Sequence, residues 1–394
     1  MNNYLIPCFR FKDFQSMWKE YKIGEIFTIT RGQVLATSKT STTQSLENPY
    51  PVYSSQTKKN GLMGFYKSYL FDTAITWTTD GANAGTVKFR EGKFFSTNVN
   101  GVLLSNNGYA NIAVAEALNK VAWKYVSKVG NPKLMNNVMS EIKIRLPETI
   151  EEQNKISSFF KDLDETISLH QQELDALKQT KQGFLQKMFP KEGQSLPEIR
   201  FKEFLSPWKE YRLSELSKVT TGKAFKSTDF KINGDYLVIT NKNIQDEENE
   251  IISKGDRINI SDEVILNKYL LSGKNILVTM DGVNIGKTGR YSNNMAVLAQ
   301  RVGRINSEQF EFIYQITKSP KFISTMNQIS VGNAIKHISL QQIADYTFMA
   351  PTEVAERLKI GEFFKDIDEL ILLTDKKIKG LQSTKKGFLQ KMFV

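Results

Sequence analysis

The segment "TKQGFLQKMF" spans Thr180–Phe189, and the segment "TKKGFLQKMF" spans Thr384–Phe393. Nine of the ten positions are identical, and both copies place apolar residues at helical spacing. An amphipathic segment that occurs twice in one chain indicates that a larger unit has been duplicated.

The duplication extends over the whole chain, because three further pairs of segments recur in the same order. They are "FRFKDFQSMWKEYKIGEI" (Phe9–Ile26) with "IRFKEFLSPWKEYRLSEL" (Ile199–Leu216), "TDGANAG" (Thr79–Gly85) with "MDGVNIG" (Met280–Gly286), and "FFKDLDE" (Phe159–Glu165) with "FFKDIDE" (Phe363–Glu369). The sequence therefore predicts two copies of one unit, each with a globular part followed by a helical part.

Each helical part carries one apolar seam, whose positions are spaced alternately by four and three residues as in paired helices. The apolar positions of the seam are Ile156, Phe160, Leu163, Ile167, Leu174 and Leu177 in the first copy, and Ile360, Phe364, Ile367, Ile371, Ile378 and Leu381 in the second. Polar His170 and Thr374 interrupt the seam at equivalent positions. Only the short linker "PKEGQSLPEI" follows the first helix. The second helix must therefore run back along the first, which predicts an antiparallel pair.

The globular parts contain short β-branched runs bounded by turn residues, such as "YLVIT" and "NILVTMDG". These runs predict a twisted mixed sheet with a few helices in each part. The expected fold class is mixed α/β, with two pseudo-repeated globular domains joined by two long antiparallel coiled-coil helices. The predicted boundaries are 1–148 and 190–350 for the globular domains, and 149–189 and 351–394 for the helices.

Positive charge is concentrated in the globular parts. The chain of 394 residues has a formal net charge of +11. Residues 1–150 carry 18 Lys and Arg against 10 Asp and Glu, residues 191–350 carry 21 against 18, and the two helical parts together balance. This distribution favours binding of a polyanion by the globular parts.

The composition argues against several classes of protein. One cysteine, Cys8, and two histidines, His170 and His337, allow no internal disulfide and no cysteine or histidine metal cluster. The chain contains no Gly-rich phosphate loop and no catalytic constellation, so we expect no catalytic residue, no metal and no cofactor in it. It has no run of eighteen apolar residues, so we expect no membrane contact and a cytoplasmic location.

The repeated "DGxNxG" motif follows a predicted strand and places Asn83 and Asn284 each between two glycines. One interpretation is a tight turn that needs positive φ and that Asp80 or Asp281 closes with a side-chain hydrogen bond. The other interpretation is a ligand site. The residues leave both interpretations open.

The order of motifs resembles the specificity subunit of type I restriction-modification systems. The resemblance is carried by "LPETIEEQNKISSFFKDLDETI" and "APTEVAERLKIGEFFKDIDELI" after the two globular parts, and by "NILVTMDGVNIGKTG", "AQRVGRI" and "GNAIKHISLQQI" in the second half. It covers essentially the entire chain. It implies two target-recognition domains, each reading one half of a split asymmetric site on double-stranded DNA. It also implies helices that set the spacing between the half-sites and dock two methyltransferase subunits.

The same resemblance implies that restriction subunits join the complex. S-adenosylmethionine, ATP and Mg would then be bound by partner subunits, and this chain would not be an enzyme. Two alternatives remain at this point: a DNA methyltransferase or nuclease with its own recognition domains, and a scaffold that binds only proteins. A cofactor loop with an "[DN]PP[FYW]" motif would favour the enzyme, and "NPYP" at Asn48 does not match it.

Candidate DNA contacts are Lys and Arg for phosphates, and Asn, Gln and Arg for base edges, since these side chains form bidentate pairs with adenine or guanine. The predicted set is Lys58, Lys59, Asn83, Lys242, Asn284, Lys287, Arg290, Gln300, Arg301 and Lys336.

The repeated ending is a candidate surface for docking partner subunits, because it would be presented once for each copy of a partner. The residues concerned are Phe184, Leu185, Met188 and Phe189, with Phe388, Leu389, Met392 and Phe393. The alternative is that these side chains only complete the seam within the chain.

Overall fold

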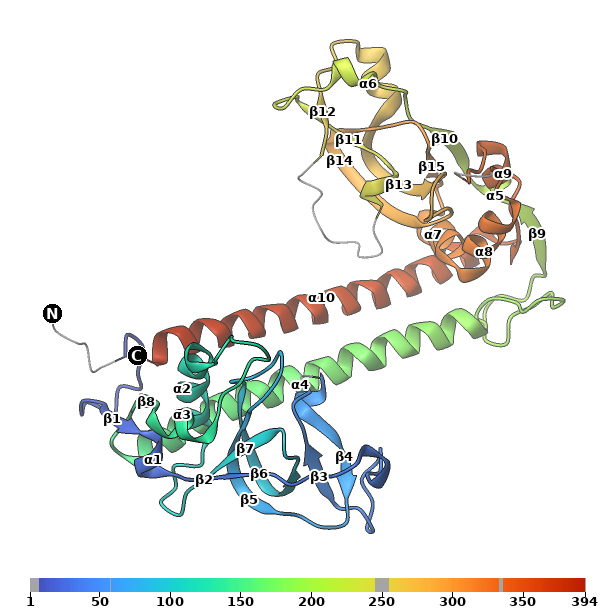
Figure 1. Cartoon of the computed structure of the whole chain (residues 1–394). Coiled ribbons are helices and arrows are strands. Elements are labelled where there is room, and N and C mark those ends of the chain that lie inside the picture. The colour runs from blue at the N-terminus through green and yellow to red at the C-terminus, as the bar shows by residue number, and fades with distance from the viewer. Residues whose placement is uncertain (1–6, 57, 245–254, 333–335, 394) are drawn as a thin grey trace. The chain divides into compact units, whose positions relative to one another are not determined.

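The computed structural model describes residues 7–56, 58–244, 255–332 and 336–393 (Figure 1). The chain divides into two compact units, of which unit 1 comprises residues 1–172 and 375–394 and unit 2 comprises residues 173–374. Both boundaries fall within the two long helices, α4 (Ile150–Lys187) and α10 (Val354–Met392). Each unit therefore contains one globular part and a segment of each helix.

Unit 1 is built on a six-stranded sheet of order β2-β7-β5-β6-β3-β4. The strands are β2 (Thr28–Arg31), β7 (Asn100–Leu104), β5 (Phe71–Thr78), β6 (Val87–Ser96), β3 (Tyr50–Tyr53) and β4 (Leu62–Tyr66). All neighbours are antiparallel except β3 and β6, which run parallel. A separate two-stranded sheet pairs β1 (Lys19–Lys22) with β8 (Lys143–Leu146).

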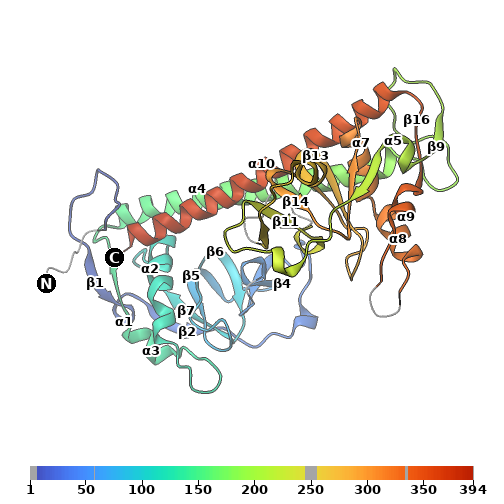
Figure 2. The same ribbon diagram turned by 90° about the horizontal axis from the view of Figure 1, so that it is seen from above.

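Helices cover one face of this sheet, as Figures 1 and 2 show for α2 (Ile112–Ala122). Ile75 and Trp77 of β5 are buried in one apolar cluster with Val114 and Leu118 of α2. Alternate residues of a strand point to opposite faces of the sheet, so the even-numbered residues of β5 around them lie on the face away from this helix. The short helices α1 (Ile23–Ile26) and α3 (Asn136–Glu141) complete the unit.

Unit 2 repeats the arrangement with a six-stranded sheet of order β10-β15-β13-β14-β11-β12. The strands are β10 (Lys218–Thr221), β15 (Val302–Asn306), β13 (Leu270–Thr279), β14 (Thr288–Leu298), β11 (Tyr236–Ile239) and β12 (Arg257–Ile258), and β9 (Trp208–Arg212) pairs with β16 (Thr347–Pro351). Its helices are α5 (Leu213–Leu216), α6 (Glu263–Tyr269), α7 (Phe310–Lys318), α8 (Pro320–Ile329) and α9 (Leu340–Ala344). The repeated strand order confirms the predicted duplication and the mixed α/β class.

The predicted helix pairing is confirmed within each unit. In unit 1, the ring centroids of Phe159 and Phe388 lie 5.0 Å apart, and Lys385 Nζ lies 2.7 Å from Asp164 Oδ1. The residue numbers rise on α4 while they fall on α10, so the helices are antiparallel. In unit 2 the equivalent pairs are Lys181 with Asp368 and Phe184 with Phe363. All the predicted seam positions are buried or half-buried.

A buried carboxylate fixes the start of each long helix. In unit 1, Arg10 Nε donates to Glu152 Oε1 at 2.6 Å, and Trp18 Nε1 donates to the same oxygen at 3.3 Å. The equivalent group in unit 2 consists of Arg200, Trp208 and Glu356, with donor–acceptor distances of 2.7 and 3.3 Å. Both glutamates are fully buried, and a buried carboxylate is stable only with such charged and hydrogen-bonded partners.

Candidate nucleic-acid interface

The "DGxNxG" motif forms the same turn in both units, at the end of β5 and at the end of β13. Gly81 and Gly85 have φ values of 93° and 84°, and Gly282 and Gly286 have values of 83° and 78°. These values lie in the region that glycine adopts without steric cost, which confirms the predicted tight turn. The backbone closes it in both units, where the N–H of the last glycine donates at 2.9 Å to the carbonyl of Thr78 or Thr279.

The aspartate of the motif does not close the turn, contrary to one interpretation of the sequence. Asp80 instead accepts hydrogen bonds from Thr79 at 2.7 Å and from Arg31 of β2 at 3.4 Å. Asp281 accepts hydrogen bonds from Asn241 and, at 3.2 Å, from Arg301. Each carboxylate thus ties the turn to a neighbouring element, and its negative charge is offset by an arginine at the surface.

Five of the predicted DNA contacts gather around Asp281 in unit 2. They are Lys242, Asn284, Gln300, Arg301 and Lys336, and the side chains of all five are exposed. Their neighbourhood follows from three contacts with the turn: the Arg301–Asp281 ion pair, the Asn241–Asp281 hydrogen bond beside Lys242, and the hydrogen bond from Gly282 N to Lys336 O at 3.1 Å. The arrangement presents cations and amides together on one surface.

The equivalent surface of unit 1 is built differently. Asn83 is half-buried, and its Nδ2 donates to Ser55 O at 3.1 Å, so this amide holds the loop after β3. Lys59 is exposed and adopts φ = 49°. The side chain of Lys58 lies outside the described part of the chain.

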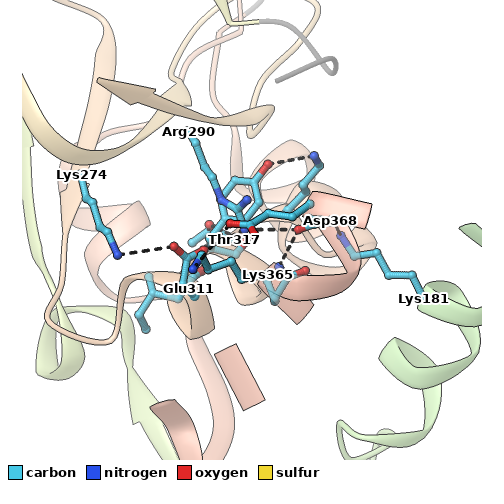
Figure 3. A network of polar contacts seen from close by, with 12 residues as sticks. Lys181, Lys274, Arg290, Glu311, Thr317, Lys365 and Asp368 are labelled. Carbon is cyan, nitrogen blue, oxygen red and sulfur yellow. Dashed lines mark hydrogen bonds and ion pairs between the residues drawn. The ribbon is translucent and has the colours of Figure 1, made fainter. Parts of the chain in front are cut away.

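The structure does not bring Arg290 to this surface, which corrects its place among the predicted DNA contacts. Arg290 lies opposite Ile276 in the β13–β14 ladder, so its side chain points to the core face. There its Nη2 lies 2.9 Å from Glu311 Oε2 and 3.2 Å from Asp368 Oδ2 (Figure 3). Its guanidinium carbon lies 4.0 Å from the ring centroid of Tyr314. The charge of Arg290 is therefore committed to the junction with α10.

Lys287, the remaining predicted contact, is half-buried at the base of the turn. Its backbone N–H donates to Asn284 O at 3.0 Å. The structure thus places it next to the cluster around Asp281, but with less of its side chain exposed than the five residues named above.

The structure packs apolar side chains of the repeated ending inside the chain, which was the alternative to partner docking. Met188 belongs to the core of unit 2, and the ring centroids of Phe189 and Trp208 lie 6.3 Å apart. Met392 and Phe393 belong to the core of unit 1. The remaining four, which are half-buried against the same two cores, are Phe184, Leu185, Phe388 and Leu389.

These contacts explain why the ending occurs twice. The ending of the first helix completes the core of unit 2, and the ending of the second helix completes the core of unit 1. The two cores present equivalent tryptophans, Trp18 and Trp208, and equivalent phenylalanines, Phe160 and Phe364. The same segment therefore fits both cores.

The structure adds polar residues that sequence reasoning did not select. Near the turn of unit 1, Arg31 Nη2 lies 3.4 Å from Asp80 Oδ2, and Lys133 Nζ lies 4.0 Å from Asp80 Oδ1. Arg90 and Asn100 line a cavity beside the same turn. Strand order brings these residues together from distant parts of the chain, so only Asp80, within the motif, carried a signal in the sequence.

Comparison with known proteins identifies the family. The family model described as "Type I restriction modification DNA specificity domain" matches residues 15–179 and again residues 206–383. The chain belongs to the type I restriction-modification DNA specificity family. Each matched region contains one copy of the six-stranded sheet and the turn and most of the following long helix. Membership of this family makes recognition of a DNA sequence the function of the two units.

Similar proteins include two specificity subunits and one solved structure. The specificity subunit of the type I restriction enzyme MjaVIII of Methanocaldococcus jannaschii is 25% identical over 94% of this chain and 91% of its own. The specificity subunit of the type I restriction enzyme MpnII of Mycoplasma pneumoniae is 35% identical over 36% of this chain and 42% of its own. The crystal structure of the S subunit from M. genitalium shares the fold, with a TM-score of 0.70 at 14% identity over 99% of both chains.

Among the described residues, no group of three or more His, Cys, Asp or Glu side chains could hold a metal ion. Within the same residues, no helix is both long and apolar enough to cross a membrane.

Proposed function

We propose that each unit reads one half of a split, asymmetric DNA site through the surface around its "DGxNxG" turn. The observation that carries the proposal is the cluster around Asp281, where amide and guanidinium groups are exposed beside Lys242 and Lys336. Amide and guanidinium groups can form bidentate pairs with base edges, and the lysines can contact phosphates. The corresponding surface of unit 1 differs in its side chains, which suits recognition of a different half-site.

We also propose that the long helices set the spacing of the half-sites and dock two methyltransferase subunits, and that restriction subunits join the larger complex. Because the side chains of the repeated ending are buried or half-buried in the two cores, we propose that docking uses other faces of the helices as well. Leu169 of α4 and Leu373 of α10 occupy equivalent positions and are exposed, which supports one docking site for each copy of the partner.

In this proposal the chain supplies recognition and has no catalytic centre of its own. Methyl transfer and cleavage, with their S-adenosylmethionine, ATP and Mg, belong to the partner subunits, and the complex acts in the cytoplasm. A methyltransferase assay of the isolated chain provides the check, because methyl transfer without the partner would favour the alternative of an enzyme with its own recognition domains.

The decisive experiment maps the methylated sequence made by the complex of this chain with its methyltransferase. We expect Asn284→Ala and Gln300→Ala to relax the choice of base in one half of the site only, by about 1–3 kcal/mol of discrimination for each lost bidentate pair. Asn294→Ala is the matched control and should leave the site unchanged, since Asn294 is an exposed asparagine within β14 and outside the cluster. A change in both half-sites, or in neither, would contradict the proposal.

A further inference from the structure

The outer face of the unit 1 sheet, away from α2, holds a polar cavity of about 190 Å³. Strands β5, β6 and β7 contribute residues that include Thr76, Lys88, Arg90 and Asn100, and the turn contributes Asn83. Among the described residues that line the cavity there are two cations and no carboxylate. The cavity therefore has a positive charge that its own lining does not neutralise.

Arg90 supplies the buried part of that charge, because the residue is only 5% exposed. Its Nε donates to Thr76 Oγ1 at 3.2 Å, its Nη1 donates to Asn60 O at 2.8 Å, and its guanidinium lies 3.8 Å from the ring centroid of Tyr53. These partners are neutral, and burial lowers the pKa of Arg90 to about 10. A buried cation with neutral partners is costly unless an anion joins it.

Unit 2 shows that the fold does not require polar residues at these positions. The strand registers place Leu277 where unit 1 has Thr76, Tyr291 where it has Arg90, and Val302 where it has Asn100. Leu277 and Val302 are buried in an apolar cluster, and Tyr291 packs against it. The same position of the sheet is thus apolar in unit 2 but polar and hollow in unit 1.

We propose that the unit 1 cavity binds a phosphate group. Phosphate oxygens accept hydrogen bonds from guanidinium, ammonium, hydroxyl and amide groups, and the cavity offers all four. A nucleobase is less suitable, because it would stack on an aromatic face and Arg90 covers that of Tyr53. One source of this phosphate group is the DNA backbone, and this part of the inference rests on the proposed function. The other source is a free phosphate ion.

The first test measures the DNA affinity of the full chain with a fluorescent duplex over a range of KCl concentrations. We expect Arg90→Gln to weaken binding about tenfold and to reduce the slope of log K against log salt by about one, since one phosphate contact is lost. Arg90→Lys should keep the slope. Lys12→Gln is the charge-matched control, because Lys12 is exposed and lies outside the cavity lining. An unchanged slope in folded Arg90→Gln would rule out the DNA backbone as the source.

The second test uses inorganic phosphate and thermal unfolding, which separates this inference from the proposed function. Phosphate should raise the Tm of the wild type more than chloride does at equal ionic strength, and Arg90→Gln should lose this increase. Arg90→Tyr introduces the residue found at the equivalent position of unit 2 and should also lose the increase in Tm. This second variant keeps the test valid if Arg90→Gln does not fold.

The outcomes of the two tests distinguish the two sources. If no form of the chain bound DNA while phosphate still stabilised only the proteins with Arg90, the cavity would bind a free phosphate. The proposed function would then be contradicted, and the inference about the cavity would stand. No effect of phosphate on the Tm, together with an unchanged salt slope, would overturn the inference.

Discussion

Units 1 and 2 share one strand order, yet they differ on the outer face of the sheet and at the junction with the long helices. On the outer face, Thr76 of unit 1 lines a polar cavity, whereas the equivalent Leu277 of unit 2 lies in an apolar cluster. At the junction, the side chain of Asp164 is 52% exposed in its pair with Lys385, whereas that of Asp368 is 12% exposed in its pair with Lys181.

The shared parts are those that hold each unit together: the Trp–Glu–Arg group at the start of each long helix, the repeated ending and the glycine turn. The parts that differ line the outer face and the junction. The two units thus keep the same strand order although these surfaces differ. The remaining positions are therefore free to differ between two half-sites.

The largest difference between the units is expected at the helix junction. Asp368→Ala removes the acceptor shared by Lys181, Arg290 and Gln315, and loss of one partner from a buried charge network costs about 3 kcal/mol or more. Asp164→Ala should cost about 0–1 kcal/mol, as for an exposed pair. Denaturant unfolding combined with peptide-resolved hydrogen exchange would assign each loss to its unit. Equal losses would show that the two junctions are energetically alike.

The outer faces provide the second comparison. Leu277→Ser places a hydroxyl in a buried apolar cluster and should destabilise unit 2 by about 3 kcal/mol. Thr76→Ser keeps the hydroxyl that accepts a hydrogen bond from Arg90 and should cost less than about 1 kcal/mol. Denaturant unfolding combined with peptide-resolved hydrogen exchange would again measure the loss of stability in each unit. A comparable loss in both variants would mean that the unit 1 face is packed as tightly as that of unit 2.

The glycine turn should behave alike in both units. Gly85→Ala and Gly286→Ala each force an alanine into positive φ, at a cost of about 1–2 kcal/mol. The added Cβ would lie 2.7 Å from Val126 Cγ2 in unit 1 and 3.0 Å from Met326 Cβ in unit 2. Local hydrogen exchange at the two turns would report the effect. A large difference between the losses of stability in the two variants would show that the two turns are not equivalent, although their sequences match.

The smallest effect is expected at Glu116, whose Oε1 lies 4.0 Å from Lys385 Nζ in unit 1. Burial raises the pKa of Glu116, and Lys385 and Lys88 offset this only in part. An acid with a raised pKa disfavours the folded state once the pH exceeds its ordinary pKa. Glu116→Gln should therefore stabilise unit 1 at neutral pH, by less than about 1 kcal/mol, and the gain should vanish at acidic pH, where the unfolded glutamate is also protonated.

The matched variant for this test is Gln315→Glu in unit 2, where Gln315 Nε2 donates to Asp368 Oδ2 at 3.3 Å. A second carboxylate beside Asp368 should lower stability increasingly as pH rises. Unfolding curves recorded from acidic to neutral pH would show opposite trends for the two variants. A gain for Glu116→Gln that did not depend on pH would point to packing rather than charge.

The sequence by itself determined the duplication, the mixed α/β class, the two long helices and their antiparallel pairing. The duplication follows from segments that recur in the same order, and the other features follow from the β-branched runs, the heptad seam and the length of the linker. The matching order of motifs also sufficed to indicate the family. For the candidate site, residue type was enough to select Asn284, Gln300 and Arg301, but not to show that they lie together.

Tertiary structure alone decided where these charged and polar side chains lie. Pairing of β15 with β13 brings Arg301 to Asp281, whereas Arg290, only four residues after Gly286, lies opposite Ile276 and points into the core. The repeated ending likewise has the amphipathic pattern of a docking surface, but the core that it completes belongs to the other copy of the repeat. Cross-strand register and contacts between distant segments set these outcomes, and neither is encoded in the spacing of residues along the chain.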